Sequence, residues 1–230
     1  MTLLNKLPGV LTSEVRTVEQ LQACDALVIP GGESTTMALI AEQWGLLPAL
    51  QQFANDEKPI WGTCAGLIFL ANRLSAGGKQ GGQKLIGGLD IEVHRNFFGA
   101  QINSFEAILP TPACLAELGG DPTVRCVFIR APAIIDVGSD VEVLATYTLT
   151  KDELIQAQGR ESVIVAVRSK NLMATSFHPE LTNDTRWHQF FVDLVREYVA
   201  SHGTATSKIG ALPANSVPRS SYRAADMPVY

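Results

Sequence analysis

The sequence predicts an α/β protein in which helices flank a mostly parallel sheet. Two strand–turn–helix units carry this prediction. In the first, residues 26–30 form a short apolar run that leads into two glycines, and a helix capped by Ser34 or Thr35 follows. In the second, the apolar residues 59–61 lead into a glycine turn, and apolar residues after Cys64 recur at helical spacing. Short buried strands that alternate with helices are typical of parallel sheets.

The remaining elements follow from spacing and composition. One helix is expected at residues 47–55 and another over about residues 183–201, where large apolar side chains share one face. Residues 75–88 hold six glycines, which predicts a loop. Further strands are expected at residues 90–94, 101–109, 124–129, 141–146, 163–168 and 171–177. Residues 1–202 are therefore expected to form one domain. Residues 203–230, rich in Gly, Ala, Ser, Thr and Pro, are expected to be a disordered tail.

Net charge and cysteine spacing argue against several classes of protein. The 230 residues carry a formal net charge of -5 and no cluster of basic side chains, so neither nucleic acid nor a membrane is an expected partner. The four cysteines, at positions 24, 64, 114 and 126, form no C-x-x-C pair, which argues against a metal site. Their irregular spacing, together with the lack of a secretory signal and of a long apolar run, favours a cytoplasmic location.

The first chemical motif is residues 62–66, Gly-Thr-Cys-Ala-Gly. Glycines on both sides of Cys64 permit a sharp turn from strand to helix, as in the serine elbow of α/β-hydrolases. The first turn of a helix favours the thiolate, which is the form of cysteine that attacks a carbonyl carbon. The same pattern also fits a small buried cysteine at a glycine turn.

The second motif is residues 178–180, His-Pro-Glu. A residue before proline favours extended backbone, in which residues two positions apart point to the same side. Glu180 is therefore expected to approach the ring of His178 and fix its tautomer, which leaves the other ring nitrogen free to face Cys64. Taken alone, the motif also fits a histidine at a strand end beside a solvated carboxylate.

Two further features could bind a ligand. The turn at residues 30–34, Pro-Gly-Gly-Glu-Ser, lets backbone amides approach a carboxylate or an oxyanion at a helix start, although a plain capping turn fits equally. Arg95 and Arg130 each follow a strand-like run, where a guanidinium could hold a carboxylate with two hydrogen bonds. Each arginine, taken singly, also fits a surface ion pair.

The order of these motifs resembles that of class I glutamine amidotransferases. Five longer strings make the chain similar to the glutaminase subunits of pyridoxal 5′-phosphate synthase, especially the plant-type members. These strings are residues 29–37, 61–68, 94–99, 128–132 and 176–182. The resemblance covers about residues 22–200.

The resemblance implies a flavodoxin-like, three-layer fold and the hydrolysis of L-glutamine to glutamate and ammonia. Cys64 would form a glutamyl thioester, and His178 with Glu180 would complete a catalytic triad. The amide of Ala65 would help to hold the oxyanion. The residues that would contact glutamine are Gly32, Glu33, Ser34, Arg95, Ile129 and Arg130.

The resemblance also implies a protein partner. Ammonia would pass to a separate, barrel-shaped synthase subunit, and the glutaminase would be poorly active until that subunit docks. No metal ion and no cofactor is expected on this chain.

The chain departs from the family at its start. Members usually carry a strand, a Leu-Gln-Gly loop and a helix before the region equivalent to residues 15–21, whereas this chain begins at Met1 without them. The departure leaves one alternative function open, which is a catalytically impaired binding or regulatory subunit of the same complex. A class I amidotransferase that serves another pathway is the second alternative.

Overall fold

The computed structural model describes residues 1–75, 82–98, 104–154 and 159–204. The start of the strand expected at 101–109, most of the expected tail, and residues 76–81 of the expected loop lie outside the described residues. In the described part, the loop prediction holds for residue 75 and residues 82–88, which form no helix or strand.

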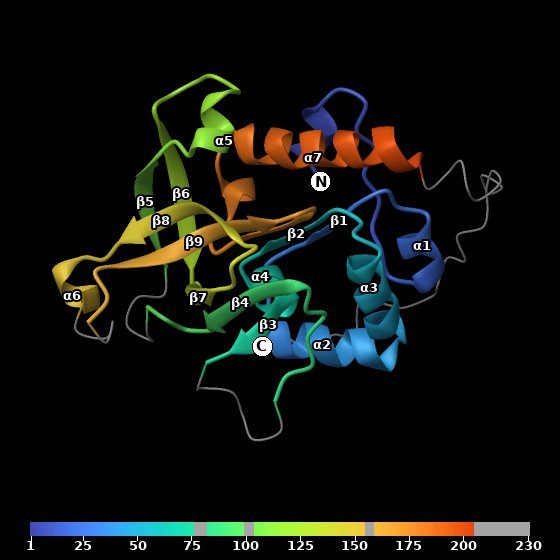
Figure 1. Cartoon of the computed structure of the whole chain (residues 1–230), viewed down its shortest axis with the longest axis horizontal. Helices are drawn as coiled ribbons and strands as arrows, with labels where there is room; N and C mark the ends of the chain where they lie inside the picture. The colour runs from blue at the N-terminus through green and yellow to red at the C-terminus, as the bar shows by residue number, and fades with distance from the viewer. Residues whose placement is uncertain (76–81, 99–103, 155–158, 205–230) are drawn as a thin grey trace, which may run out of the picture.

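An eight-stranded sheet forms the centre of the molecule, in the order β1-β2-β10-β9-β7-β4-β3, with β8 paired to β9 (Figure 1). The strands are β1 (Leu27–Ile29), β2 (Ile60–Thr63), β3 (Ala71–Leu74), β4 (Leu89–His94), β7 (Ala133–Val137), β8 (Glu142–Thr148), β9 (Ser162–Ser169) and β10 (Leu172–Thr175). A separate antiparallel hairpin joins β5 (Ser104–Pro110) to β6 (Thr123–Ile129).

The sheet has a parallel part and an antiparallel part. Strands β1, β2 and β10 run parallel to one another, and β3 runs parallel to β4. Strand β9 is antiparallel to β10, β7 and β8, and β7 is antiparallel to β4. Because β1, β2 and β10 run in the same direction, their carboxyl ends meet at one edge of the sheet.

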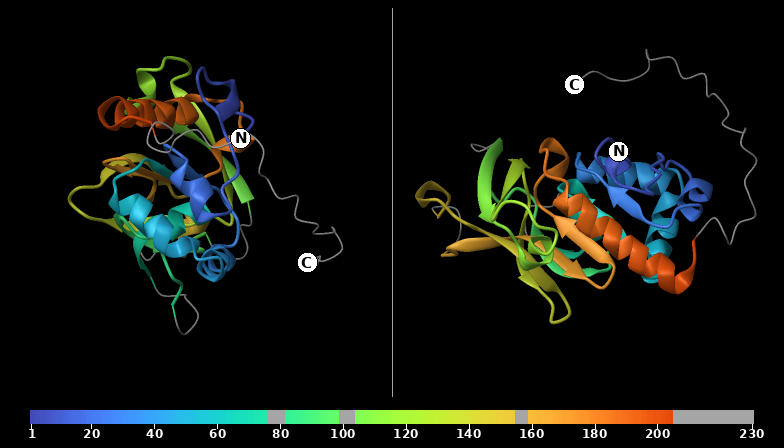
Figure 2. Two further views of the ribbon diagram at one scale, coloured as in Figure 1. Left: turned by 90° about the vertical axis from the view of Figure 1, so that its right-hand side faces the viewer. Right: turned by 90° about the horizontal axis from the view of Figure 1, so that it is seen from above.

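Helices cover both faces of the sheet (Figures 1 and 2), which confirms the predicted α/β class. The helices are α1 (Val18–Gln22), α2 (Ser34–Gln43), α3 (Leu46–Asn55), α4 (Ala65–Leu70), α5 (Ala113–Ala116), α6 (Lys151–Leu154) and α7 (Arg186–His202), with 3₁₀ turns η1 (Leu4–Lys6) and η2 (Pro179–Leu181).

Strand β2 shows how the two faces are built. Ile60 packs into the core that α2, α3 and α4 cover, whereas its neighbour Trp61 packs into the core beneath α7. Trp61 there meets Phe191 of α7 with ring centroids 5.6 Å apart. The alternation of the pleat therefore places two large side chains in two separate cores.

Three local predictions are corrected. Helix α2 is capped by Glu33, not by Ser34 or Thr35, because the Glu33 carboxylate accepts from the backbone amides of Thr35 and Thr36. The helix expected from residue 183 begins at Arg186, because the preceding Asp184 folds back to accept from the Arg186 amide.

The third correction concerns the chain after the Cys64 turn. Helix α4 ends at Leu70, and Ala71 begins strand β3, which pairs with β4. Strand β7 was not predicted either.

Candidate active site

Cys64 lies on the sharp turn between β2 and α4. Its backbone has φ 51° and ψ -102°, an uncommon conformation for a residue with a side chain. The Cys64 amide donates to the Thr175 carbonyl of β10 at 2.8 Å, which ties the turn to the next strand. A Cβ added at Gly66 would lie 2.1 Å from the Ile29 carbonyl oxygen, and one added at Gly62 would lie 2.4 Å from the Gly66 oxygen. The turn therefore requires glycine on both sides of the cysteine.

His178 follows the end of β10, and its amide donates to the Val127 carbonyl of β6 at 2.8 Å. The ring Nδ1 lies 2.8 Å from Glu180 Oε1, so the expected pair forms. The expected extended backbone is wrong beyond His178, because Pro179 begins the 3₁₀ turn η2 that brings Glu180 back toward the ring.

The pKa values of His178 and Glu180 are both shifted by their neighbours. Interaction with Cys64, and then with Glu180, raises the pKa of His178 to about 9, although burial opposes the rise. Burial acts to raise the pKa of Glu180, but the hydrogen bond with His178 outweighs it, so this pKa lies below its ordinary value. At neutral pH the ring is therefore an imidazolium beside a carboxylate.

The unpaired ring nitrogen is buried. His178 Nε2 has no hydrogen-bond partner in the described part of the chain. The Cys64 thiol donates instead to the Ile129 carbonyl at 3.8 Å, at the end of β6. Nε2 is thus left available to a reacting group beside Cys64, as a general acid or base must be.

The glycine turn after β1 reaches the same site. A Cβ added at Gly31 would lie 2.4 Å from Cε1 of His178, so only glycine leaves the ring its place. Gly32 follows, and Glu33 then caps α2. Burial acts to raise the pKa of Glu33, but hydrogen bonds from Thr36 and Thr35 outweigh it and lower this pKa to about 2.

Arg95 joins this turn from the end of β4. Its Nη2 donates to Ser34 Oγ at 3.0 Å and Thr35 Oγ1 at 2.9 Å, and it lies 3.4 Å from Glu33 Oε1. Only 21% of its side chain is exposed, so the contact of Arg95 with Glu33 is not an ordinary surface ion pair. Residues 61 positions apart therefore meet at the start of α2.

The other candidate residues lie at the same edge of the sheet. Ala65 is the first residue of α4, and an amide in the first turn has no partner inside its helix. Arg130 follows Ile129 with φ 45° and an exposed side chain. The structure thus gathers all ten candidate residues around the carboxyl ends of β1, β2, β4, β6 and β10.

Three neighbours of the site escape prediction. Gln83 hydrogen-bonds to Ser34, Thr175 accepts from both the Cys64 amide and Trp61 Nε1, and His188 packs edge-on against Trp61 at 5.2 Å. The strand before the His-Pro-Glu motif could have drawn attention to Thr175. No sequence pattern marks Gln83.

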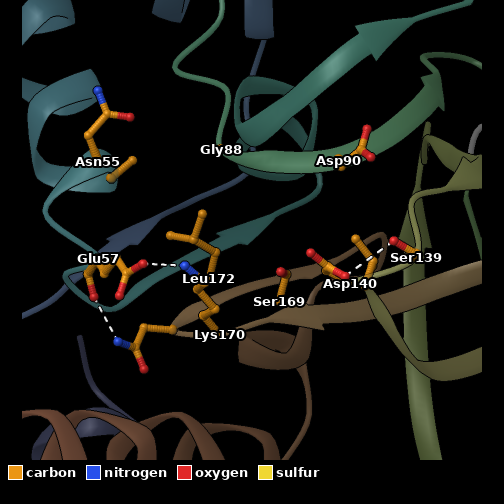
Figure 3. A pocket seen from close by; sticks show the side chains of 12 residues that line it. Asn55, Glu57, Gly88, Asp90, Ser139, Asp140, Ser169, Lys170 and Leu172 are labelled. Carbon is orange, nitrogen blue, oxygen red and sulfur yellow. Dashed lines mark hydrogen bonds and ion pairs between the residues drawn. The ribbon is translucent and has the colours of Figure 1, made fainter.

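A cavity of about 330 Å³ lies elsewhere, at the opposite edge of the sheet (Figure 3). Glu57, Asp140 and Lys170 are among its lining residues, and Leu172, which begins β10, lines it too. None of the candidate site residues borders it. Within the described ranges, no group of three or more His, Cys, Asp or Glu residues could hold a metal ion. No helix there is both long and apolar enough to cross a membrane.

Comparison with solved structures gives the class of protein. A crystal structure described as a glutamine amidotransferase matches with a TM-score of 0.68 and 36% sequence identity, over 85% of this chain and 91% of that chain. The chain therefore has the fold of a glutamine amidotransferase. The model of the SNO glutamine amidotransferase family matches residues 5–197, and the chain belongs to this family.

Two curated relatives are similar to this chain over most of its length. The chain is 52% identical to the probable pyridoxal 5′-phosphate synthase subunit PDX2 of Arabidopsis thaliana, over 87% of this chain and 82% of the relative. It is 47% identical to the pyridoxal 5′-phosphate synthase subunit PdxT of a Nocardioides species, over 82% of this chain and 86% of the relative.

Proposed function

We propose that this chain is the glutaminase subunit of a pyridoxal 5′-phosphate synthase. It releases ammonia from L-glutamine and supplies it to a synthase subunit for vitamin B6 biosynthesis. The observation that carries the proposal is the coupling of His178 to both Glu180 and Cys64, since it joins a nucleophile to its acid–base partner. The names of the relatives supply the pathway.

The reaction proceeds in two halves. Cys64 reacts as the thiolate that pairs with the His178 imidazolium. Its sulfur attacks the side-chain carbonyl carbon of glutamine, and the Ala65 amide donates to the developing oxyanion. The His178 imidazolium gives its proton to the leaving nitrogen, so ammonia departs and a glutamyl thioester remains on Cys64. His178 then removes a proton from water, which attacks the thioester and releases glutamate, and the thiolate–imidazolium pair is restored.

Glutamine binding is assigned to the residues that surround this centre. Gly32, Glu33 and Ser34 form one side, and Arg95 approaches them from β4. Ile129 and Arg130 form the other side, at the end of β6. The guanidinium groups suit the α-carboxylate of glutamine. A barrel-shaped synthase subunit as partner and a cytoplasmic location belong to the same proposal.

The test is ammonia release from L-glutamine by the full chain, with and without the synthase subunit. We expect slow release alone, faster release with the partner, and a loss of at least about 10³-fold for Cys64→Ala. Cys24→Ala is the matched control, because the Cys24 thiol donates to the Gln20 carbonyl of α1, away from the site, and this variant should remain active.

Trapping separates the remaining functions. Mass spectrometry should detect a glutamyl adduct on Cys64. Binding of the synthase without adduct or ammonia would instead indicate an impaired binding or regulatory subunit. Copurification with a different acceptor subunit would indicate an amidotransferase of another pathway.

A further inference from the structure

Gln83 contacts Ser34 through both ends of its side-chain amide. Its Nε2 donates to the Ser34 carbonyl at 2.9 Å, and its Oε1 accepts from the Ser34 hydroxyl at 3.0 Å. A carbonyl oxygen can only accept, so the Ser34 carbonyl fixes which end of the amide is nitrogen. With its nitrogen facing the Ser34 carbonyl, Gln83 presents its oxygen to the Ser34 hydroxyl, so this hydroxyl must be the donor of the second hydrogen bond.

The hydroxyl of Ser34 has one proton and two lone pairs. The hydroxyl donates its one hydrogen bond to Gln83 Oε1, and it accepts one from Arg95 Nη2 at 3.0 Å. One lone pair remains, so a ligand group that approaches this oxygen must be a donor. The residue is only 3% exposed, which makes an unmatched ligand group there costly.

The segment that carries Gln83 is held in place along its length. Gln51 of α3 donates to the Leu85 carbonyl at 3.0 Å, and the Ile86 amide donates to the Phe69 carbonyl at 2.9 Å. Lys84 pairs with Glu42 of α2. Gln83 is thus preorganised against Ser34 and needs no ligand to order it.

We propose that Gln83 is a positioning residue that makes the Ser34 turn select the α-ammonium group of glutamine. It does so by holding the Ser34 hydroxyl as an acceptor. The adjacent Glu33 carboxylate favours the same positive group, while Arg95 lies where it can hold the α-carboxylate. This inference rests on the proposed glutaminase function.

The experiment compares L-glutamine with 4-carbamoylbutanoate, which is glutamine without its amino group. Ammonia release is measured for the full chain together with its synthase subunit. The wild-type chain should prefer glutamine in kcat/KM, and Gln83→Met should reduce this preference by about tenfold or more, mainly through KM for glutamine. Gln83→Glu keeps an acceptor oxygen toward the Ser34 hydroxyl but places its second oxygen against the Ser34 carbonyl, so its preference should lie between those of Gln83→Met and wild type.

Gln51→Met is the matched control, because it removes a hydrogen bond from the same segment without touching Ser34. It should leave the preference unchanged. If Gln83→Met lowers kcat/KM equally for both substrates, or leaves the preference intact, the residue is only structural and the inference is wrong.

Calorimetry with the same two ligands separates this inference from the proposed function. It reads the preference as a ratio of Kd values and needs no turnover. A chain that binds glutamine selectively through Gln83 but releases no ammonia would overturn the proposed function alone. Equal binding of the two ligands by wild-type chain would overturn the inference.

Discussion

Cys64 and His178 reach the same site, but the first is held by steric contact of the backbone and the second by hydrogen bonds. Around Cys64, the backbones of β1, β2 and α4 approach so closely that Gly66 has no room for a Cβ. His178 is held by its amide bond to Val127 and by its ring bond to Glu180.

Substitutions at these two places should therefore have different consequences for the protein. A side chain added at the elbow must push apart backbone segments of the core, so the whole fold suffers. A change beside His178 alters the tautomer and position of one ring and leaves the cores untouched. Variants at the two places should therefore divide between loss of stability and loss of chemistry.

The largest expected effect on stability is that of Gly66→Ala. Because the new Cβ would lie 2.1 Å from the Ile29 carbonyl oxygen, the free energy of unfolding should fall by about 3 kcal/mol or more. Urea denaturation followed by circular dichroism measures this fall. Cys64→Ala, which adds no atom to the turn, should cost less than about 2 kcal/mol. A Gly66→Ala chain as stable as wild type would contradict a sterically closed elbow.

Glu180→Gln should reduce activity and spare the fold. A glutamine amide can donate to Nδ1 of His178, which would stabilise the tautomer that carries its proton on Nε2 and cannot accept a proton there. We expect kcat for ammonia release to fall by about 10³-fold, while the free energy of unfolding changes by less than about 2 kcal/mol. Glu197→Gln, at an exposed carboxylate of α7, is the control. A variant with kcat within about threefold of wild type would remove Glu180 from the triad.

The same contrast explains what the sequence could predict. The elbow depends on local chemistry, namely glycines that allow a tight turn, and it can be predicted from neighbouring residues. The pairing of His178 with Glu180 was predicted too, but from an extended backbone, whereas the proline starts η2. The close approach of Gly31 to His178 joins positions 147 residues apart, so its necessity appears only in the folded chain.

Other features depended on competition between partners. Ser34 and Thr35 are both good capping residues, but the longer Glu33 side chain reaches two amides and takes the cap. Ala71 continues an apolar helical pattern, yet pairing with Leu89 draws it into β3. Gln83 lies in a segment without periodicity, and its partner Ser34 is 49 residues away.

A third expected effect is the pH dependence of stability that His178 contributes. Its pKa is about 9 in the folded chain, against an ordinary value of 6.5. Between these values the folded chain keeps a proton that the unfolded chain releases, so the free energy of unfolding should fall as pH rises. The contribution is fully present below about pH 6.5 and is lost through pH 9, which amounts to about 3 kcal/mol.

Urea denaturation at pH 6, 7.5 and 9 should therefore show a steeper decline for wild type than for His178→Gln, which has no ring to titrate. Burial also raises the pKa of Cys114 and Cys126, and these thiols add a decline at high pH. That decline is common to both chains and cancels in the difference between them. Cys64→Ala removes the largest cause of the His178 shift, so its slope should lie between the two. Equal slopes in wild type and His178→Gln would mean that the neighbours of His178 do not raise the pKa of its ring. Glu180 would then orient the ring without stabilising its positive charge.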